Sequence, residues 1–298
     1  KYIAALNRFK IVVDEFSITK FTPEALHRMV EAYYEMGMYE DSYNKMFDLN
    51  GKVALITGSS KGIGLAIAWQ MARSGASVVI SSRKKEVCDK VCSEITKQGL
   101  SAVSIPCNVG VKQDVEDLVA NTNASFGNVD ILVCNAATNP VFGPLSDIPD
   151  DAFEKLVKVN IQSTLWLSKL VVPQMISNKG GSIILLSSIA AIRGNAFIGG
   201  YGMTKAAESA LARNLAVEYG HANVRVNAIS PGLVKTDFAK ALWNDPVYRK
   251  KQENATPLRR IGLPEDIAGV AHFLASPASA YLTGQSIVVD GGETISSL

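Results

Sequence analysis

Tyr201, Lys205 and Ser188 make up a set of side chains that could transfer a proton in carbonyl or alcohol chemistry. A tyrosine and a lysine four residues apart lie on the same face of a helix. In that position the lysine ammonium stabilises phenolate and lowers the tyrosine pKa from its ordinary value of about 10. The phenol could then act as a general acid or base near neutral pH. Because Tyr-x-x-x-Lys also occurs by chance on ordinary helices, the prediction depends on the elements that surround it.

A glycine-rich turn after a buried strand predicts a phosphate-binding site. The apolar run 53–57 leads into the turn from Gly58 to Gly64, with the spacing G-x-x-x-G-x-G, and then into an alanine-rich helix. Glycines let the backbone approach a pyrophosphate closely, and the N-terminus of the following helix presents free N–H groups to it. A second apolar strand ends at Ser81-Ser82-Arg83, about where an NAD site carries an acidic residue. This order of elements predicts dinucleotide binding.

Strand-like and helical runs alternate along the chain, which predicts a parallel sheet covered by helices on both faces. Strands are expected near 53–57, 77–82, 101–106, 130–134, 182–187, 224–229 and 285–289. Helices are expected near 62–74, 84–98, 112–126, 151–178, 201–219 and 264–275. Since crossovers between parallel strands are right-handed, the predicted fold class is α/β, a doubly wound Rossmann-type sheet of about seven strands. Ligands bind beyond the carboxyl ends of such strands, where Gly58, Asn135, Ser188 and Pro231 are expected.

The composition indicates one compact catalytic domain and argues against several classes of protein. The chain has 298 residues, of which 47% are apolar, enough for a large core. Its formal charge of +2, without a block of lysine and arginine, argues against nucleic-acid binding. No apolar run approaches the ~20 residues that span a bilayer, and the first residues lack the features of a signal peptide. We therefore expect a soluble, cytoplasmic protein, with the final Ser-Ser-Leu as only a weak peroxisomal-type signal.

The cysteines and histidines are too scattered to predict a metal site or a disulfide framework. The cysteines, which we expect to be reduced and partly buried, are Cys88, Cys92, Cys107 and Cys134. The three histidines are His27, His221 and His272.

Residues 1–48 differ from the rest of the chain, since tyrosine and methionine are frequent there. Thr22-Pro23-Glu24 is typical of a helix start, with threonine as the cap and proline in the first turn. We expect a helical arm that packs on its own domain, residues 49–298, or on a sister subunit. A first residue of lysine is also compatible with a chain that begins inside a longer polypeptide.

From about Leu49 to its end the chain resembles the short-chain dehydrogenase/reductase family. The segment from Thr57 to Gly64 is similar to the cofactor turn of that family, and Cys134-Asn135-Ala136-Ala137 to its Asn-Asn-Ala-Gly segment. The family's four catalytic positions correspond here to Asn160, Ser188, Tyr201 and Lys205. Within the family, the chain looks most like the NADPH-dependent carbonyl reductase/retinol dehydrogenase type. Two departures, Ala137 in place of glycine and Asn108 in place of an aspartate, concern the fine contacts to adenine.

The resemblance implies a role for each catalytic side chain. Tyr201 would exchange the proton with the substrate oxygen, and Ser188 would hydrogen-bond the developing oxyanion. Lys205 would hold the ribose hydroxyls and lower the Tyr201 pKa, and Asn160 would anchor a water that links Lys205 to solvent. The implied cofactor-binding residues are Gly58, Ser60, Lys61, Gly62, Ile63, Gly64, Ser82, Arg83, Asn108, Val109, Asn135, Ala136, Ala137, Tyr201, Lys205, Pro231, Gly232, Val234 and Thr236. The resemblance also implies a homotetramer or a homodimer.

The residues after the second strand predict NADP(H) rather than NAD(H). Ser82 and Arg83 offer no carboxylate to a 2′-hydroxyl, and Arg83 could form charge-assisted bonds to a 2′-phosphate. Lys61 in the glycine turn could add a second positive charge.

An apolar or aromatic ketone or aldehyde is the expected small-molecule substrate. The predicted pocket residues are Ser188, Ala190, Phe197, Leu233, Phe238 and Trp243. Between Ser188 and Tyr201, Arg193 and Asn195 could add a charge and an amide to the cleft or could face water.

Three other functions stay open. A 3-oxoacyl-carrier-protein reductase uses the same side chains, but it needs a basic patch for its acidic carrier, for which Arg193, Arg259 and Arg260 are the candidates. A non-catalytic dinucleotide-binding protein would normally have lost part of the Ser/Tyr/Lys set. A scaffold role would depend on the aromatic arm alone.

Overall fold

The computed structural model describes residues 27–28, 31 and 45–296, and the chain divides into two compact units, residues 1–48 and 49–298. In the first unit, residues 27, 28 and 31 are helical, and Arg28 Nη1 donates to Glu31 Oε2 at 2.8 Å. The expected helix start at Thr22 and the aromatic stretch up to Tyr43 lie outside the described residues. The predicted arm therefore stays a prediction.

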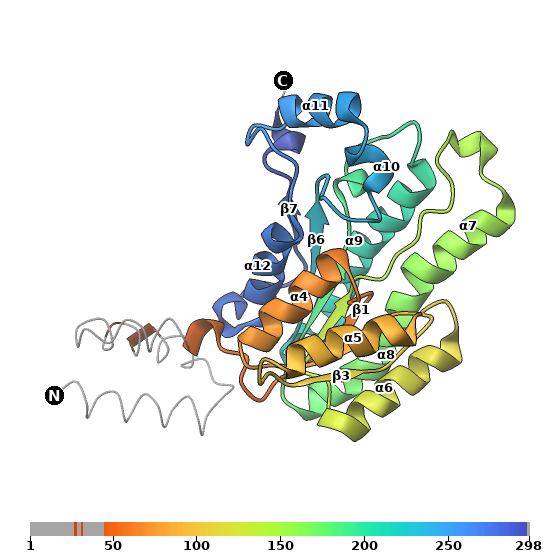
Figure 1. The fold of residues 1–298 in the computed structure, drawn as a ribbon. Helices are drawn as coiled ribbons and strands as arrows, with labels where there is room; N and C mark the ends of the chain where they lie inside the picture. Colours follow the sequence, from red (N-terminus) through yellow and green to blue (C-terminus); the bar gives the residue numbers. More distant parts are fainter. Residues whose placement is uncertain (1–26, 29–30, 32–44, 297–298) are drawn as a thin grey trace. The chain divides into compact units, whose positions relative to one another are not determined.

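The second unit is built on a parallel sheet of seven strands in the order β3-β2-β1-β4-β5-β6-β7 (Figure 1). The strands are β1 (Val53–Thr57), β2 (Ser77–Ser81), β3 (Ala102–Ser104), β4 (Ile131–Cys134), β5 (Gly181–Leu186), β6 (Val224–Pro231) and β7 (Ser286–Val289). Every neighbouring pair is parallel, and Ile56 of β1, for example, pairs with Ile80 of β2 on one side and Val133 of β4 on the other. The strand order reverses its direction between β1 and β4, which makes this the switch point where ligands bind in such folds. The predicted Rossmann-type fold is confirmed.

Helices connect the strands and cover the sheet. The α-helices are α4 (Gly62–Arg73), α5 (Lys85–Thr96), α6 (Lys112–Phe126), α7 (Asp150–Val157), α8 (Ser163–Ser177), α9 (Gly199–Tyr219), α10 (Lys240–Trp243), α11 (Pro246–Ala255) and α12 (Pro264–Ala275). The 3-10 turns are η1 (Leu145–Asp147), η3 (Ile189–Ala191), η4 (Gly220–Ala222), η5 (Pro277–Ser279) and η6 (Glu293–Ile295), and η2 (Lys158–Gln162) is a π-helix.

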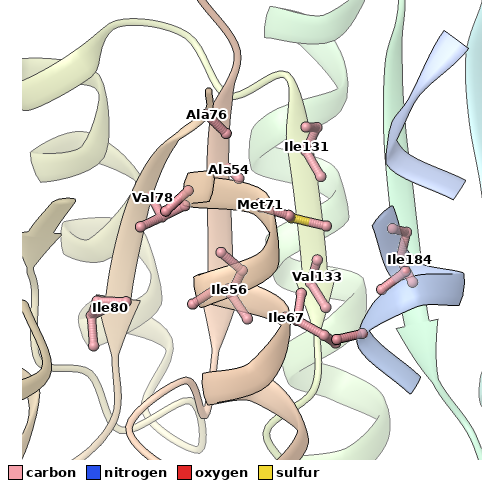
Figure 2. Close-up of a cluster of buried hydrophobic side chains, with 14 of the residues drawn as sticks. Ala54, Ile56, Ile67, Met71, Ala76, Val78, Ile80, Ile131, Val133 and Ile184 are labelled. Atoms are coloured by element: carbon pink, nitrogen blue, oxygen red, sulfur yellow. The ribbon is translucent and has the colours of Figure 1, made fainter. Parts of the chain in front are cut away.

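Two apolar cores lie on opposite faces of the sheet, because successive strand side chains point to opposite sides. On one face, β1 contributes Ile56, which packs with residues of α4, α5 and α12; Figure 2 shows Ile67 and Met71 of α4 over the strands. On the other face, β1 contributes Leu55, which belongs to a cluster with residues of α6, α8 and α9. The five inner strands, β2, β1, β4, β5 and β6, are mostly buried on both sides, so they read as nearly continuous apolar runs rather than alternating ones.

The structure corrects the sequence prediction at three places. The helix expected over 151–178 is interrupted, because residues 158–162 form the π-helix η2 between α7 and α8. The third strand covers 102–104 rather than 101–106. Two short helices, α10 and α11, occupy the segment after β6, where no helix was expected. The last difference has a local reason, since Asp245 caps α11 by accepting hydrogen bonds from the N–H groups of Val247 and Tyr248.

Within the described part of the chain, no helix combines the length and the apolar character that crossing a membrane requires.

Candidate functional site

The glycine turn after β1 forms a cradle into which side chains would not fit. Gly58 has a φ of +68°, and a Cβ on it would lie 2.8 Å from the Asn135 amide nitrogen. A Cβ on Gly64 would lie 2.5 Å from both that nitrogen and the Gly58 carbonyl oxygen. The turn leads into α4, whose N-terminal end carries the positive end of the helix dipole. This cradle at the switch point fits the pyrophosphate of a dinucleotide.

Asn135, just after β4, holds the turn in place. Its side-chain amide donates to the carbonyl oxygens of Thr57 (2.9 Å) and Gly58 (3.1 Å). The Thr57 hydroxyl in turn accepts from the backbone N–H groups of Asn135 and Ala136, at 3.1 and 3.2 Å. The Asn135 amide therefore helps to fix the conformation of the glycine turn. The other residues expected in this part of the site are placed in the same turn or after β4, namely Ser60, Gly62, Ile63 and Ala137.

The loop after β6 lies against the glycine turn. A Cβ on Gly62 would be 3.3 Å from the Thr236 methyl carbon, and the Lys61 ammonium lies 3.2 Å from the Asp237 carboxylate. Earlier in this loop, the Gly232 N–H donates to Val289 of β7 at 3.0 Å. The structure thus brings the expected cofactor residues Pro231, Gly232, Val234 and Thr236 to the switch-point end of the sheet.

At the end of β2, Arg83 is exposed and available to an anion, while the Ser82 hydroxyl lies 3.0 Å from the Cys88 sulfur. Asn108, expected to reach adenine, uses its side-chain oxygen to accept from the Gly110 N–H at 3.2 Å. Val109, beside it, is buried. The expected second charge, Lys61, is directed toward Asp237 rather than toward Arg83. The prediction of a site for the 2′-phosphate therefore depends on Arg83.

Ser188, Tyr201 and Lys205 come together from β5 and α9. Ser188 follows β5, and its hydroxyl accepts from the Ala190 N–H at 3.1 Å. Tyr201 and Lys205 lie one turn apart on α9, and the Lys205 ammonium is 5.5 Å from the centre of the Tyr201 ring. That ammonium donates to the Leu186 carbonyl oxygen at 2.6 Å and to the Glu208 carboxylate at 2.8 Å. Two of its three N–H bonds are thereby used, which leaves one for a ribose hydroxyl.

Asn160 lies in the π-helix η2, fully buried. Its side-chain oxygen accepts from the Thr138 N–H at 2.9 Å, and its amide donates to the Thr138 carbonyl and to the Thr204 hydroxyl, both at 3.0 Å. These bonds tie the loop after β4 to α9, next to Lys205. Single-turn π-helices of this kind occur frequently at functional sites.

The electrostatics around Tyr201 differ from the sequence expectation. Burial raises the pKa of Tyr201 above its ordinary value, and the Glu208 carboxylate raises it further. The Lys205 ammonium and the Ser188 hydroxyl lower the Tyr201 pKa, as expected, but they do not outweigh the burial. Burial also disfavours the Lys205 ammonium, but the charges of Glu208 and Tyr201 outweigh it and raise the Lys205 pKa. The sequence shows that Tyr201 and Lys205 are close to each other, but it does not show how deeply the pair is buried.

One aromatic side chain lies beside Tyr201, and an aromatic pair lies ahead of α9. The Phe238 ring centre lies 5.9 Å from that of Tyr201. Phe197, ahead of α9, stacks on Phe142 of the loop after β4 with centres 5.4 Å apart, and both are more than half exposed. The structure thus places Phe238 beside the Tyr201 ring and packs the turn that carries Ser188 and Ala190 against α9, where the Ala190 carbonyl lies next to Gly202.

The other two predicted pocket residues, Trp243 and Leu233, each line a hollow of their own, and their place in the substrate pocket stays a prediction. Trp243 donates its indole N–H to the Thr236 carbonyl at 2.7 Å and lines a hollow of about 300 Å³ with residues of α11. Leu233 lines a second hollow of about 150 Å³ that includes Asp290 and Glu293. Neither hollow is lined by Tyr201 or Ser188. Arg193 pairs with Glu293 at 3.0 Å, so its charge is not free for the substrate cleft.

Three contributors to the site escaped the sequence analysis. Glu208 is the clearest, because it follows Lys205 by three residues and Tyr201 by seven, a spacing that places all three on one helix face. Phe142 and Asp237 come from loops, and no periodicity points to them.

The structure describes all four cysteines, and each is a free thiol. Burial raises the pKa of Cys107 to about 12, and burial also raises the pKa of Cys134. Among residues 27–28, 31 and 45–296, no three His, Cys, Asp or Glu side chains gather as metal ligands would.

Family models divide the chain in two. Residues 58–294 match a model described as enoyl-(acyl carrier protein) reductase. Residues 1–46 match a model described as outer membrane lipoprotein, which covers too little of the chain to define it.

Individual proteins and structures agree with the first match. The chain is 44% identical over 244 residues to dehydrogenase/reductase SDR family member 4 of Bos taurus, covering 82% of this chain and 88% of the relative. A gluconate 5-dehydrogenase from Burkholderia cenocepacia, solved with NADP and tartrate, superimposes with a TM-score of 0.82 at 31% identity over 85% of this chain and 99% of its own. A 7α-hydroxysteroid dehydrogenase, solved with NADH and 7-oxo glycochenodeoxycholic acid, gives 0.80 at 39% identity over 83% and 96%. With the parallel sheet and the glycine turn already described, these matches show that the chain belongs to the short-chain dehydrogenase/reductase family of oxidoreductases.

Proposed function

We propose that this oxidoreductase uses NADP(H) to interconvert a carbonyl and an alcohol on an apolar or aromatic substrate. The observation that carries the proposal is the convergence of Ser188, Tyr201 and Lys205 beside the glycine cradle, at the end of the sheet where ligands bind in this fold. We assign catalysis to Asn160, Ser188, Tyr201 and Lys205.

The nicotinamide supplies or accepts the hydride when it is bound. In carbonyl reduction, Tyr201 donates its phenolic proton to the substrate oxygen, and the Ser188 hydroxyl donates a hydrogen bond to the charge that develops there. The remaining N–H of Lys205 binds a ribose hydroxyl, and its charge favours the phenolate that the proton transfer leaves behind. Asn160 keeps α9 in register with the loop after β4 through Thr138 and Thr204.

The preference for NADP(H) depends on Arg83. One structural neighbour was solved with NADP and another with NADH, so family membership leaves both nucleotides open. Arg83 is exposed at the end of β2, and the two residues before it, Ser81 and Ser82, carry no negative charge that would repel a 2′-phosphate.

The proposal of an apolar substrate rests on Phe238 beside Tyr201 and on the exposed pair of Phe142 and Phe197, which lies ahead of α9. The neighbouring Arg193 is paired with Glu293, and the Asn195 side chain accepts from the N–H groups of Phe197 and Ile198. The Arg193 guanidinium and the Asn195 side-chain oxygen are therefore engaged within the protein. One structural neighbour was solved with 7-oxo glycochenodeoxycholic acid, a steroid ketone, and another, a gluconate 5-dehydrogenase, with tartrate, so the ligands of the neighbours do not by themselves select a substrate class.

A 3-oxoacyl-carrier-protein reductase is the second candidate, and the description of the matching family model is compatible with it. The candidate basic patch weakens this alternative. Arg260 donates twice to Asp266, at 2.6 and 2.8 Å, Arg193 pairs with Glu293, and Arg259 donates to the Asn254 carbonyl. Two of the three charges are thus neutralised by a neighbouring carboxylate.

A substrate panel separates the candidates. Purified protein is assayed with NADPH and NADH against aromatic ketones, aliphatic aldehydes, sugar acids and a 3-oxoacyl chain on its carrier protein, and with NADP⁺ against the matching alcohols. We expect the highest kcat/KM with NADPH and an aromatic or apolar carbonyl. The highest value with the carrier-bound chain would replace the first proposal by the second, and turnover of none would leave a dinucleotide-binding protein. A cytoplasmic location and a homotetrameric or homodimeric assembly stay predictions, which cell fractionation and sedimentation would test.

A further inference from the structure

A buried carboxylate lies directly beside the proposed catalytic lysine. Glu208 and Lys205 are each 1% exposed, and Glu208 Oε2 is 2.8 Å from the Lys205 ammonium. Both project from α9 on the face that carries Tyr201. A charged side chain is almost never fully buried unless it is paired, so Glu208 and Lys205 require each other.

The surroundings of this pair contain few other charges. The titratable groups that interact with Glu208 are Lys205 and Tyr201 on α9 and the Cys134 thiol at the end of β4. Strand β5 contributes the Leu186 carbonyl oxygen, which accepts from Lys205 at 2.6 Å. The Ser187 hydroxyl donates to the Lys205 carbonyl oxygen at 2.7 Å, which anchors this turn of α9 against β5.

Stability alone gives little reason for such a pair. Removing two charges from water offsets most of their attraction, and replacing a buried ion pair with apolar side chains is often neutral or stabilising. A half-exposed lysine without a partner would serve a ribose contact equally well. The position of Glu208 therefore points to a role in the chemistry of its neighbours.

We propose that Glu208 is a positioning residue that holds the Lys205 ammonium beside Tyr201 and extends to higher pH the range in which the Tyr201 phenol stays protonated. The inference rests on the proposed function, because it assigns a purpose to the proton on Tyr201. A lysine charge alone would drive the phenol toward phenolate, and an ionised carboxylate beside that lysine cancels part of the charge. The site then stays ready to donate a proton to a carbonyl oxygen over a wider range of pH.

The titration of Glu208 supports this role. Burial raises the pKa of Glu208 to about 7, although Lys205 opposes the shift. Above that pH the carboxylate is ionised and raises the Tyr201 pKa, whereas below it the phenol is protonated in any case. The carboxylate is therefore ionised throughout the range in which the Tyr201 phenol, whose pKa is raised above its ordinary value, loses its proton.

Glu208→Gln tests the proposal through pH profiles of kcat/KM in both directions. Carbonyl reduction requires the phenol and fails at high pH, and alcohol oxidation requires phenolate and fails at low pH. Without the carboxylate the Tyr201 pKa falls, so both limits should move to lower pH by about one unit, the smaller end of what a nearby charge does. A one-unit shift gives about tenfold more phenolate at a pH well below the pKa. Unchanged limits, or limits that move to higher pH, would overturn the proposal.

Two further variants separate charge from structure. Glu208→Asp keeps the carboxylate but places it farther from Lys205, so both pH limits should shift in the same direction as with Glu208→Gln, but by less. This variant also tests the proposal if Glu208→Gln does not fold. Glu218→Gln removes an exposed carboxylate from the same helix and should leave both limits in place. An Asp variant that shifts as far as the Gln variant would show that geometry, and not charge, matters.

A measurement without substrate distinguishes failure of the proposed function from failure of the role proposed for Glu208. The phenolate absorbance of Tyr201 is titrated as the difference between each protein and the same protein carrying Tyr201→Phe. The midpoint should be lower with Glu208→Gln than with Glu208. A lower midpoint in a protein that reduces no carbonyl would reject the proposed function alone, whereas an unchanged midpoint would reject the role of Glu208.

Discussion

In the proposed mechanism, the proton that reaches the substrate oxygen comes from one atom, the phenol oxygen of Tyr201. The side chains around it have separate tasks: Lys205 supplies positive charge, Glu208 moderates that charge, and Ser188 offers a hydrogen bond. In the same proposal Arg83, exposed after β2, concerns the choice of nucleotide. Substitutions at Tyr201 and at Arg83 should therefore affect different kinetic constants.

Tyr201→Phe should lower kcat by about 10²–10⁴-fold, the contribution of a positioned acid or base, and leave cofactor affinity nearly unchanged. The substitution removes the phenol oxygen and keeps the ring that packs near Phe238. Turnover is followed by nicotinamide absorbance and affinity by calorimetry, with the exposed Tyr281→Phe as the control. Turnover close to that of the wild type would remove Tyr201 from the mechanism.

We expect the wild type to prefer NADPH and the double variant Ser82→Asp/Arg83→Leu to prefer NADH. A hydrogen bond to a charged group contributes roughly 1.5–3 kcal/mol, so the loss of one contact to the 2′-phosphate corresponds to about ten- to a hundredfold in kcat/KM. The ratio of kcat/KM for the two nucleotides is measured in both proteins. The exposed Lys84→Leu, one residue further on, is the matched control. A wild type that prefers NADH, or a variant that does not shift, would contradict the assignment of Arg83.

At the scale of elements, the site is assembled by the ends of strands and the beginnings of helices. Strand β1 leads into the glycine turn and α4, and β4 presents Asn135 to that turn. The π-helix η2 turns Asn160 toward Thr138 and Thr204 within what would otherwise be one continuous helix. A Cβ added to Gly64 would lie 2.5 Å from both the Asn135 amide nitrogen and the Gly58 carbonyl oxygen, so the turn leaves no space there.

Gly64→Ala should weaken cofactor binding and destabilise the fold by about 1–3 kcal/mol, the usual range for overpacking. The added carbon would lie 2.5 Å from the Gly58 carbonyl oxygen, which belongs to the backbone and cannot swing away. Gly269→Ala is the control, since nothing lies within 4 Å of a Cβ there and helix α12 should gain roughly 0.5–1 kcal/mol. Urea unfolding and calorimetry give both quantities. Equal stabilities of the two variants would show that the turn opens easily.

At the scale of the whole molecule, residues 49–298 contain the sheet, both apolar cores and every residue of the proposed site. Leu49 belongs to this unit, because it is buried and its N–H donates to the Ser74 carbonyl at 2.8 Å. The first unit matches a different family model from the second, so the two can be tested separately.

A protein of residues 49–298 should fold and bind NADP(H) with the affinity of the full chain. Circular dichroism and calorimetry check this, and sedimentation shows whether the arm contributes to assembly. A protein of residues 51–298 is the control: it lacks Leu49 and should be less stable by about 2–5 kcal/mol, the range for removing a large buried side chain. Failure of residues 49–298 to fold would place the arm in the core.

The sequence by itself determined the seven strands, the doubly wound fold class and the family. These depend on local features: apolar runs of strand length, the glycines of the turn, and the i, i+4 spacing of Tyr201 and Lys205. Tertiary structure alone decided which polar groups that are distant in the sequence interact with one another. It assigned the Asn135 amide to the glycine turn, the Lys61 charge to Asp237 and the indole of Trp243 to Thr236.

The same difference between local and tertiary information explains why the direction of the Tyr201 pKa shift could not be predicted from the sequence. Spacing predicts that Lys205 is near, but the depth of burial and the charge of Glu208 depend on how α9 packs against β5 and β4. Burial acts on a charge through everything that displaces water around it, and that environment is built from segments more than 70 residues apart, such as Cys134 and Glu208. No local pattern carries this information, so the direction of the shift became visible only in the folded protein.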